Sequence, residues 1–250
     1  MSAARFAVAA AGAIGAYLLA LAVLAPATLV DAQLQRASGG AVGLAQARGS
    51  LWSGAGRLEL RDARGGLIAG REATWRVVGL APLAARLDLD LVLEGGGRSI
   101  LTSVAWGRIA VGSGSIDLPV GVFGAAYPML GALGLTGDLR VDIVRLVVDR
   151  GRMSGAATAR WTRAGSTHLG GQPFGEYALN FEGDGAAGRA GLTTVKGPVA
   201  LEGSAVWSEA GAGAWRVRAT VPVALRARIG PFLAMVATQR GDGVYEIELR

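Results

Sequence analysis

Apolar and polar residues alternate with a period of two through much of this sequence, and that alternation restricts the fold more than any other feature. In RLDLDLVLE (residues 86–94) two aspartates, Asp88 and Asp90, alternate with leucines. The leucines that share the opposite face are Leu87, Leu89, Leu91 and Leu93. Because successive side chains of a strand point to opposite faces, such segments are expected to bury their leucines and expose their charges, as strands of antiparallel sheets do.

Glycine-rich turns separate the predicted strands. Glycine supplies 40 of the 250 residues, a share well above the usual ~7%. The GGG at residues 95–97 joins RLDLDLVLE to SILTSVAWGRIAV (residues 99–111) and predicts a hairpin. Later alternating segments follow at intervals of about ten residues, as in all-β proteins. The sequence therefore predicts a mainly β protein built on an antiparallel sheet.

Three segments break the alternation and are predicted to be short helices that cover the sheet. They are LAPLAARL (residues 80–87), PVGVFGAAYPMLGALGL (residues 119–135) and IGPFLAMVATQ (residues 229–239). The second lies near the centre of the chain. The β-rich region could therefore consist of two similar halves, residues 45–118 and 136–250.

An uncharged run of 25 residues, Phe6–Val30, precedes the strands. A helix needs about 20 apolar residues to cross a bilayer, so the run predicts a single transmembrane anchor. Arg5 precedes the run and Asp31 follows it, and positive charge favours the cytoplasmic side. We therefore expect residues 1–5 in the cytoplasm and residues 31–250 on the other side of the membrane.

Two further properties of the apolar run concern its processing and its partners. The small residues Ala25–Ala27 (APA) are similar to a cleavage site, although a cleaved signal peptide has an apolar region of only about 7–15 residues. Gly12, Ala16 and Ala20 lie four residues apart, and small residues at this spacing could let a partner helix approach closely. The length of the run favours a retained anchor over a cleaved signal peptide. The small-residue spacing allows a helix contact but is also expected by chance in so alanine-rich a segment.

The charged and reactive residues exclude several function classes. The net charge is +6, but in DLRVDIVRLVVDR (residues 138–150) acids and bases alternate, unlike a surface that follows a phosphate backbone. Cysteine is absent, which excludes disulfides and cysteine-based zinc sites. The single histidine, His168, lies in a polar loop without a partner motif. We expect no enzyme, no cofactor, no metal site and no nucleic acid partner.

One tryptophan stands among glycines in RGSLWSGAG (residues 48–56). Glycines on both sides of Trp52 let the backbone turn sharply, and a buried tryptophan fills a large volume. We therefore predict that Trp52 packs inward and locks the start of the β-rich domain. The other tryptophans are also expected to lie in the core: Trp75, Trp106, Trp161, Trp207 and Trp215.

Three segments together resemble the type II secretion system protein N family: GSLWSGAGRLEL (residues 49–60), ATWRVVGLAPL (residues 73–83) and IGPFLAMVATQRGDGVYEIEL (residues 229–249). The resemblance implies an inner-membrane anchor and a periplasmic β-rich domain, in an accessory component of the machine that exports folded proteins across the outer membrane. It implies no catalytic residues. We interpret the matching positions as structural: Gly49, Leu51, Trp52, Gly54 and Trp75.

The expected partners are other inner-membrane components of that machine. They would be contacted through the small-residue face of the anchor or through an exposed strand edge such as VYEIEL (residues 244–249). An alternative is an AsmA-like protein, anchored in the inner membrane, that handles lipid. Such a protein would leave the apolar face of its sheet open to lipid, whereas the secretion hypothesis predicts that helices of the protein cover this face.

Overall fold

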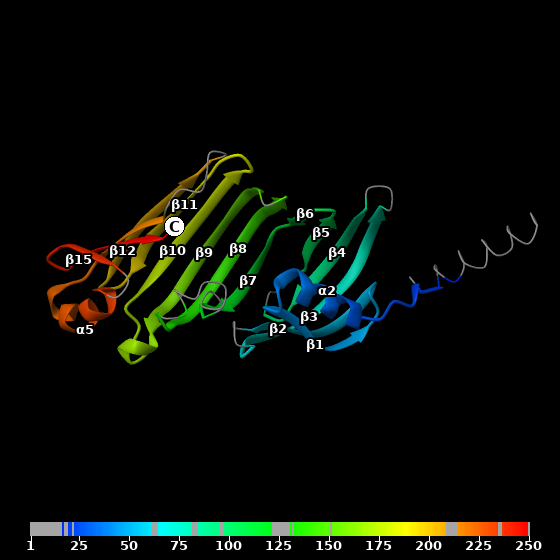
Figure 1. Cartoon of the computed structure of the whole chain (residues 1–250), viewed down its shortest axis with the longest axis horizontal. Coiled ribbons are helices and arrows are strands. Elements are labelled where there is room, and N and C mark those ends of the chain that lie inside the picture. Colours follow the sequence, from blue (N-terminus) through cyan, green and yellow to red (C-terminus); the bar gives the residue numbers. More distant parts are fainter. Residues whose placement is uncertain are drawn as a thin grey trace, which may run out of the picture.

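The computed structural model describes residues 17, 20–21, 23–61, 65–81, 85–95, 98–121, 131, 133–150, 152–208, 215–234 and 237–249. In this part of the chain fifteen strands form one sheet (Figure 1). The strands are β1 (Val42–Gly49), β2 (Ser53–Arg61), β3 (Leu67–Ala81), β4 (Arg86–Leu93), β5 (Ile100–Ala105), β6 (Arg108–Val111), β7 (Gly114–Pro119), β8 (Leu135–Asp149), β9 (Arg152–Ser166), β10 (Gly175–Asp184), β11 (Gly188–Lys196), β12 (Ala200–Trp207), β13 (Trp215–Thr220), β14 (Thr238–Gly241) and β15 (Val244–Leu249). The helices are α2 (Thr28–Ser38), the 3-10 turn η2 (Thr167–Leu169) and α5 (Val223–Ala234).

The strands follow one another across the sheet almost in chain order, and every pair is antiparallel. β6 and β7 pair in succession with β8, so the hydrogen-bonded order continues between the two predicted halves. The sheet twists along its length, so that β1 crosses the view of Figure 1 nearly horizontally while β8–β11 run steeply. The mainly β, antiparallel prediction is confirmed.

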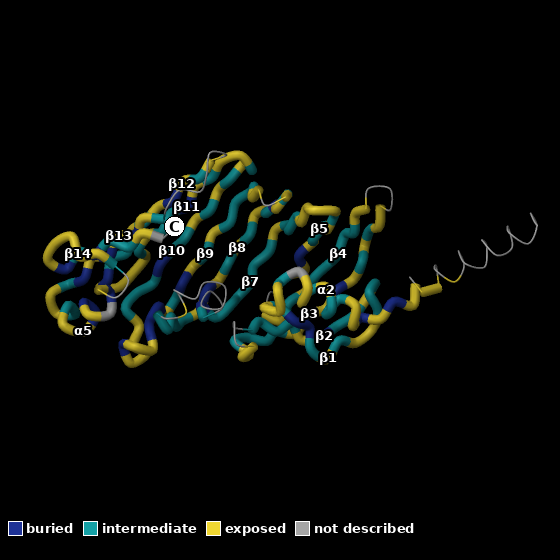
Figure 2. The backbone as a smooth tube through the Cα atoms, in the orientation of Figure 1, coloured by how far each residue is buried: buried dark blue, intermediate teal, exposed yellow. Residues whose placement is uncertain are grey.

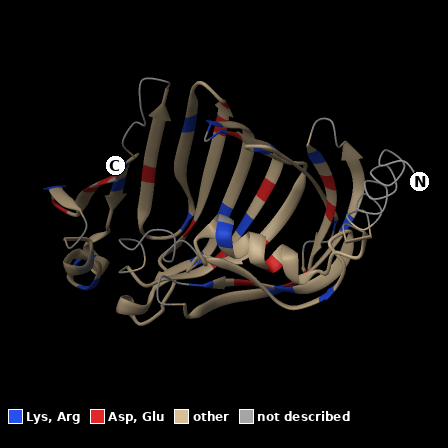
Figure 3. Ribbon diagram, turned by 45° about the vertical axis from the view of Figure 1, so that its right-hand side comes forward, with Lys and Arg blue, Asp and Glu red and all other residues tan. Residues whose placement is uncertain are grey.

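The predicted alternation divides the sheet into an apolar and a polar face. Leu91 lies opposite Trp75 on β3 and Ile100 on β5. Asp90, one residue away, lies opposite Arg76. Directly paired residues of an antiparallel sheet share a face, and tracing the pairs from β1 to β15 keeps the large apolar side chains together. Charged residues recur along the strands in Figure 3, and most of them belong to the other face.

Buried residues are few and most of them gather in three clusters, while most of the sheet is half-buried (Figure 2). One cluster contains Leu44 and Trp75 under α2. A second surrounds Leu139, Trp161 and Tyr177 in the middle of the sheet. The third joins α5 to the last strands. The two helices therefore cover the two ends of the same, apolar face.

The predicted helices are only partly found. The prediction for residues 229–239 overlaps α5, which begins earlier, at Val223, and ends at Ala234. The prediction for residues 80–87 is wrong, because Leu80 pairs with Leu87 and continues the β3–β4 ladder. Pairing with neighbouring strands overrides the helix propensity of LAPLAARL. For residues 119–135, Pro119 ends β7 and Leu135 begins β8, and residues 122–130 lie outside the described residues.

The prediction of an exposed edge at residues 244–249 is also wrong. This segment forms β15, which pairs with β13 on one side and with β14 on the other. In the described part of the sheet the outermost strands are β1 and β14. The sequence of β15 has the alternation of a strand but carries no information about which strand is outermost.

The predicted anchor falls mostly outside the described residues, as do Gly12 and Ala16, whereas Ala20 is described and exposed. Among the residues that the structure does describe, no helix is long and apolar enough to cross a membrane. The end of the apolar run packs on the sheet: Ala25 and Ala27 are buried, and α2 begins at Thr28.

Candidate functional site: a glycine–tryptophan corner and an apolar face

A tight turn between β1 and β2 forms a corner at the start of the sheet. Gly49 and Gly54 pair across the turn. The Ser50 hydroxyl oxygen accepts the backbone N–H groups of Trp52 at 3.3 Å and Ser53 at 3.2 Å. Gly49 has φ 89°, in the left-handed region, and a β-carbon there would lie 2.5 Å from the Ser53 carbonyl oxygen. The turn therefore requires glycine at position 49.

The ring that fills this corner belongs to Trp75. Its indole lies over Gly54, where a β-carbon would contact the ring and would come within 2.6 Å of the Arg48 carbonyl oxygen. The indole Nε1–H donates a 3.2 Å hydrogen bond to the Leu51 carbonyl oxygen, and Trp75 is only 7% exposed. The absence of a side chain on Gly54 thus creates the space that the Trp75 ring occupies.

Trp52 is half-buried, so the prediction that it is the core wedge is wrong. Its carbonyl oxygen accepts the backbone N–H of Val77 at 2.7 Å, which ties the turn to β3. The sequence did indicate the corner, since glycines and an aromatic residue stand close together. It could not show that the ring would come from β3, because that depends on the register of β2 against β3.

The other tryptophans differ in how far they are buried. Trp161 is buried and donates through Nε1 to the Thr136 carbonyl oxygen at 3.0 Å. Trp207 and Trp215 are half-buried. Trp106 is 91% exposed, so its predicted core position is wrong. It occupies the turn between β5 and β6, so no described residue of a neighbouring strand is paired with it.

The segment before α2 adds backbone hydrogen bonds to the corner. Pro26 and Ser50 form an isolated antiparallel bridge. The Ala27 N–H donates to the Gly49 carbonyl oxygen at 3.2 Å, and the Leu51 N–H donates to the Ala25 carbonyl oxygen at 2.8 Å. The last residues of the apolar run therefore join the β1–β2 turn directly.

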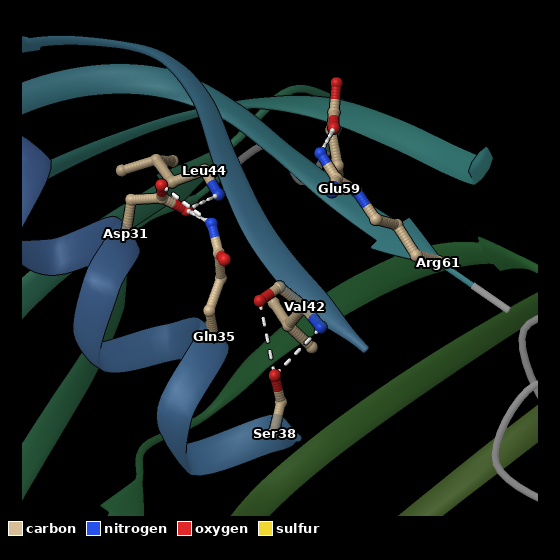
Figure 4. A network of polar contacts seen from close by, with 7 residues as sticks. All are labelled: Asp31, Gln35, Ser38, Val42, Leu44, Glu59 and Arg61. Carbon is tan, nitrogen blue, oxygen red and sulfur yellow. Dashed lines mark hydrogen bonds and ion pairs between the residues drawn. The ribbon is translucent and has the colours of Figure 1, made fainter. Parts of the chain in front are cut away.

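Polar side chains then hold α2 against β1 (Figure 4). A carboxylate oxygen of Asp31 accepts the backbone N–H of Leu44 at 2.7 Å, and the same carboxylate accepts the Gln35 amide at 2.8 Å. At the other end of the helix, the Ser38 hydroxyl oxygen accepts the Val42 N–H at 2.9 Å. The helix thus has fixed contacts with β1 at both ends, and its apolar side covers Leu44 and Trp75.

The apolar face between the two helical covers is the second feature of the candidate site. On β4 to β6 several side chains of the face remain half-buried or exposed, including Leu89 and Ile109, the latter 48% exposed. Leu91 on β4 packs against the cluster under α2, and Ile100 on β5 is buried. The prediction that helices of the protein cover the face is therefore confirmed at its two ends, while most of the predicted helix at residues 119–135 lies outside the described residues.

Reactive groups do not converge in the described part of the chain. No group of three or more His, Cys, Asp and Glu side chains there could hold a metal ion. The His168 backbone N–H donates to the Ser166 hydroxyl oxygen at 3.2 Å, which caps the short turn η2. Burial raises the pKa of Tyr177, whose hydroxyl donates to the Val199 carbonyl oxygen at 2.9 Å. These contacts stabilise the fold.

Comparison with known proteins gives one match. The family model "Type II secretion system (T2SS), protein N" matches residues 40–248. No curated protein and no solved structure matches the chain. The matched residues begin just before β1 and end within β15, so the match includes every strand of the sheet.

Proposed function

Because the chain belongs to the type II secretion system protein N family, we propose that it is an accessory component of the secretion machine, anchored in the inner membrane. The part of the apolar run before Ala25 would provide the anchor. The residues from Ala25 onward would belong to the periplasmic domain, because Ala25 and Ala27 are buried against the β1–β2 turn. This placement rests on the uncharged run Phe6–Val30 and on the single flanking Arg5. The component would support export of folded periplasmic proteins across the outer membrane.

The observation that carries this proposal is the extent of the family match, which spans the whole sheet rather than one motif. The described contacts at the family-like positions are structural: Gly49 and Gly54 form the turn, and Trp75 fills the corner. Such a molecule acts by holding or contacting other proteins, and we propose no enzymatic role. Its partners would be other inner-membrane components of the machine.

The sequence and the sheet offer two surfaces through which a partner could be bound, which we call the first and second routes. The first is the small-residue face of the anchor, Gly12, Ala16 and Ala20. The second is β14, an outermost strand whose four residues are all exposed. An exposed edge strand can accept a strand from another chain through backbone hydrogen bonds.

Deleting the gene tests the function. The deletion should leave cargo proteins in the periplasm, because translocation across the inner membrane does not depend on this machine, and the wild-type gene should restore their release. A reporter that is active only outside the cytoplasm, fused after residue 40, should give signal in the membrane fraction. Normal release from the deletion strain would contradict the secretion role, and a soluble, shortened product would contradict the anchor.

Matched substitutions in the anchor test the first route. Gly12→Leu with Ala16→Leu adds bulk to the small-residue face and should reduce co-purification with other components of the machine. Ala10→Leu adds bulk on the opposite side of the predicted helix and should have no effect. Equal losses from both variants would show that helix packing at Gly12 and Ala16 is not the contact.

The exposed part of the apolar face supports a second candidate, the handling of lipid by an AsmA-like protein. Among the described residues Val104 and Ile109 remain exposed on this face, as that hypothesis requires. A deletion strain that releases cargo normally but has an altered lipid composition in its outer membrane would favour this candidate over the secretion role.

A further inference from the structure

Four tryptophans lie at intervals along one edge of the sheet. Because neighbouring strands are antiparallel, the strands β1, β3, β5, β8, β10 and β12 all end at the same edge. Trp106 lies in the turn after β5, Trp207 ends β12 and Trp215 begins β13. Trp52 lies in the turn after β1. We call this the tryptophan edge and define it by these four residues. Trp161, near the opposite edge, is buried.

Two turns of the tryptophan edge are joined. The Arg150 backbone N–H, after β8, donates a 2.8 Å hydrogen bond to the Gly107 carbonyl oxygen, after β5. A β-carbon on Gly107 would lie 3.5 Å from Cγ of Arg150, so the two turns are also in close contact. Trp106 projects from this pair of turns with 91% of its surface exposed.

A row of exposed apolar side chains begins at Val104, two residues before Trp106. Val104 pairs with Ile109, Ile109 pairs with Val148, and Val148 pairs with Met153. These four residues therefore stand in register across β5, β6, β8 and β9 on the apolar face. Each is at least 36% exposed. A contiguous row of this kind is unlike the single exposed apolar residues that are common on soluble surfaces.

Arginines surround the same turns. On the polar face, Arg108, Arg150 and Arg152 line a hollow of about 660 Å³. Two carboxylates also line it, Asp149 and Asp184. The Asp184 carboxylate already accepts the backbone N–H groups of Ala186 and Ala187, which lower its pKa. Arg108 lies 4.0 Å from the Asp149 carboxylate, and with three arginines against two carboxylates the lining has a formal charge of +1.

We propose that the part of the tryptophan edge around Trp106, formed by the β5–β6 and β8–β9 turns, binds the surface of a bilayer that contains anionic phospholipid. Tryptophan favours the level of the headgroups, where the apolar row would meet the acyl chains. Arginines near an anionic surface are attracted to its phosphates. The end of the apolar run, Ala25, also joins the sheet at this edge, in the β1–β2 turn. This inference does not depend on the secretion role.

Quenching by lipid tests the proposal. The full chain is reconstituted into phosphatidylcholine vesicles with brominated acyl chains, with and without phosphatidylglycerol. The fluorescence that belongs to Trp106 is obtained by subtracting the Trp106→Ala variant. We expect strong quenching of this component when phosphatidylglycerol is present. Each arginine near the surface raises the binding constant for anionic lipid about fivefold. Arg150→Gln should therefore lower the ratio of membrane-bound (quenched) to free (unquenched) Trp106 about fivefold.

The matched control places a tryptophan at the opposite edge. Val223 is 75% exposed there, and Val223→Trp combined with Trp106→Ala should give an indole that lipid does not quench. Unquenched Trp106 in both kinds of vesicle would overturn the proposal. Equal quenching of the two positions would also overturn it. So would an unquenched Trp106 whose replacement by alanine abolishes self-association of the protein. Quenching that is independent of phosphatidylglycerol and Arg150 would overturn the anionic-lipid part.

Discussion

Replacing Trp75 should destabilise the N-terminal part of the sheet more than replacing any other tryptophan of that region. The ring is 7% exposed and packs with Leu44 and Ala27 beneath α2. Truncation of a buried tryptophan to alanine typically costs about 3–5 kcal/mol. The substitution also leaves the Leu51 carbonyl oxygen without the indole N–H that it accepts at 3.2 Å. Trp75→Phe keeps most of the packing and should cost only about 1 kcal/mol for that hydrogen bond.

Hydrogen exchange measures this effect locally. A loss of about 3–5 kcal/mol corresponds to roughly 150-fold to 5,000-fold faster exchange, since about 1.4 kcal/mol is a factor of ten. Amides of β1, β2 and α2 should show the increase in Trp75→Ala. Amides of β13 and β15 should not, because they belong to the cluster under α5.

Two variants serve as controls for this reasoning. Trp52→Ala removes a half-buried ring and should cost about 1 kcal/mol, and Trp106→Ala removes a ring that is 91% exposed and should stay within about 0.5 kcal/mol of wild type. If Trp75→Ala exchanges no faster than Trp106→Ala, Trp75 does not hold the corner. If Trp52→Ala has the larger effect, Trp52 is the core wedge after all.

Two further predictions concern the middle of the sheet and its polar face. Gly155 has φ 122° and lies against the Arg145 carbonyl oxygen at a bulge, so Gly155→Ala should cost at least about 2 kcal/mol; an unchanged denaturation midpoint would contradict this. The Arg86 side chain donates hydrogen bonds to Asp88 and lowers the pKa of that carboxyl. Its stabilising contribution is therefore complete above the ordinary aspartate pKa of about 4 and disappears as the pH falls through the lower folded value. Asp88→Asn should flatten the decline of the melting temperature in this acidic range, and an identical decline in both proteins would exclude the contribution.

Much of the sheet could be predicted from the sequence because its signals are local. The leucines beside Asp90 lie on one face, as alternation requires, and the glycines after residue 94 separate two antiparallel strands. The same locality explains the failure at residues 80–87. Their helix-forming composition competes with strand pairing, and Leu80 pairs with Leu87 and Ala81 with Arg86.

The candidate site was predictable only in outline. Glycines around Trp52 indicated a sharp turn near the start of the domain, and the structure has that turn. The ring over Gly54 comes from Trp75, which is distant in sequence and is placed there by the β2–β3 register. The exposed position of Trp106 was likewise hidden, because a tryptophan in a strand and one in a two-residue turn have similar sequence neighbours.

The sequence by itself determined the antiparallel β class, the two chemically distinct faces, the glycine turns and the family, because all of these depend on spacing along the chain. Only the tertiary structure decided which strands are outermost, which tryptophans are buried, and that α2 and α5 cover the two ends of one face. It also brought Val104, Ile109, Val148 and Met153 into a single row. These features depend on strand order and register, which join residues that are far apart in the chain, and period-two alternation is the same whichever strand lies beside it.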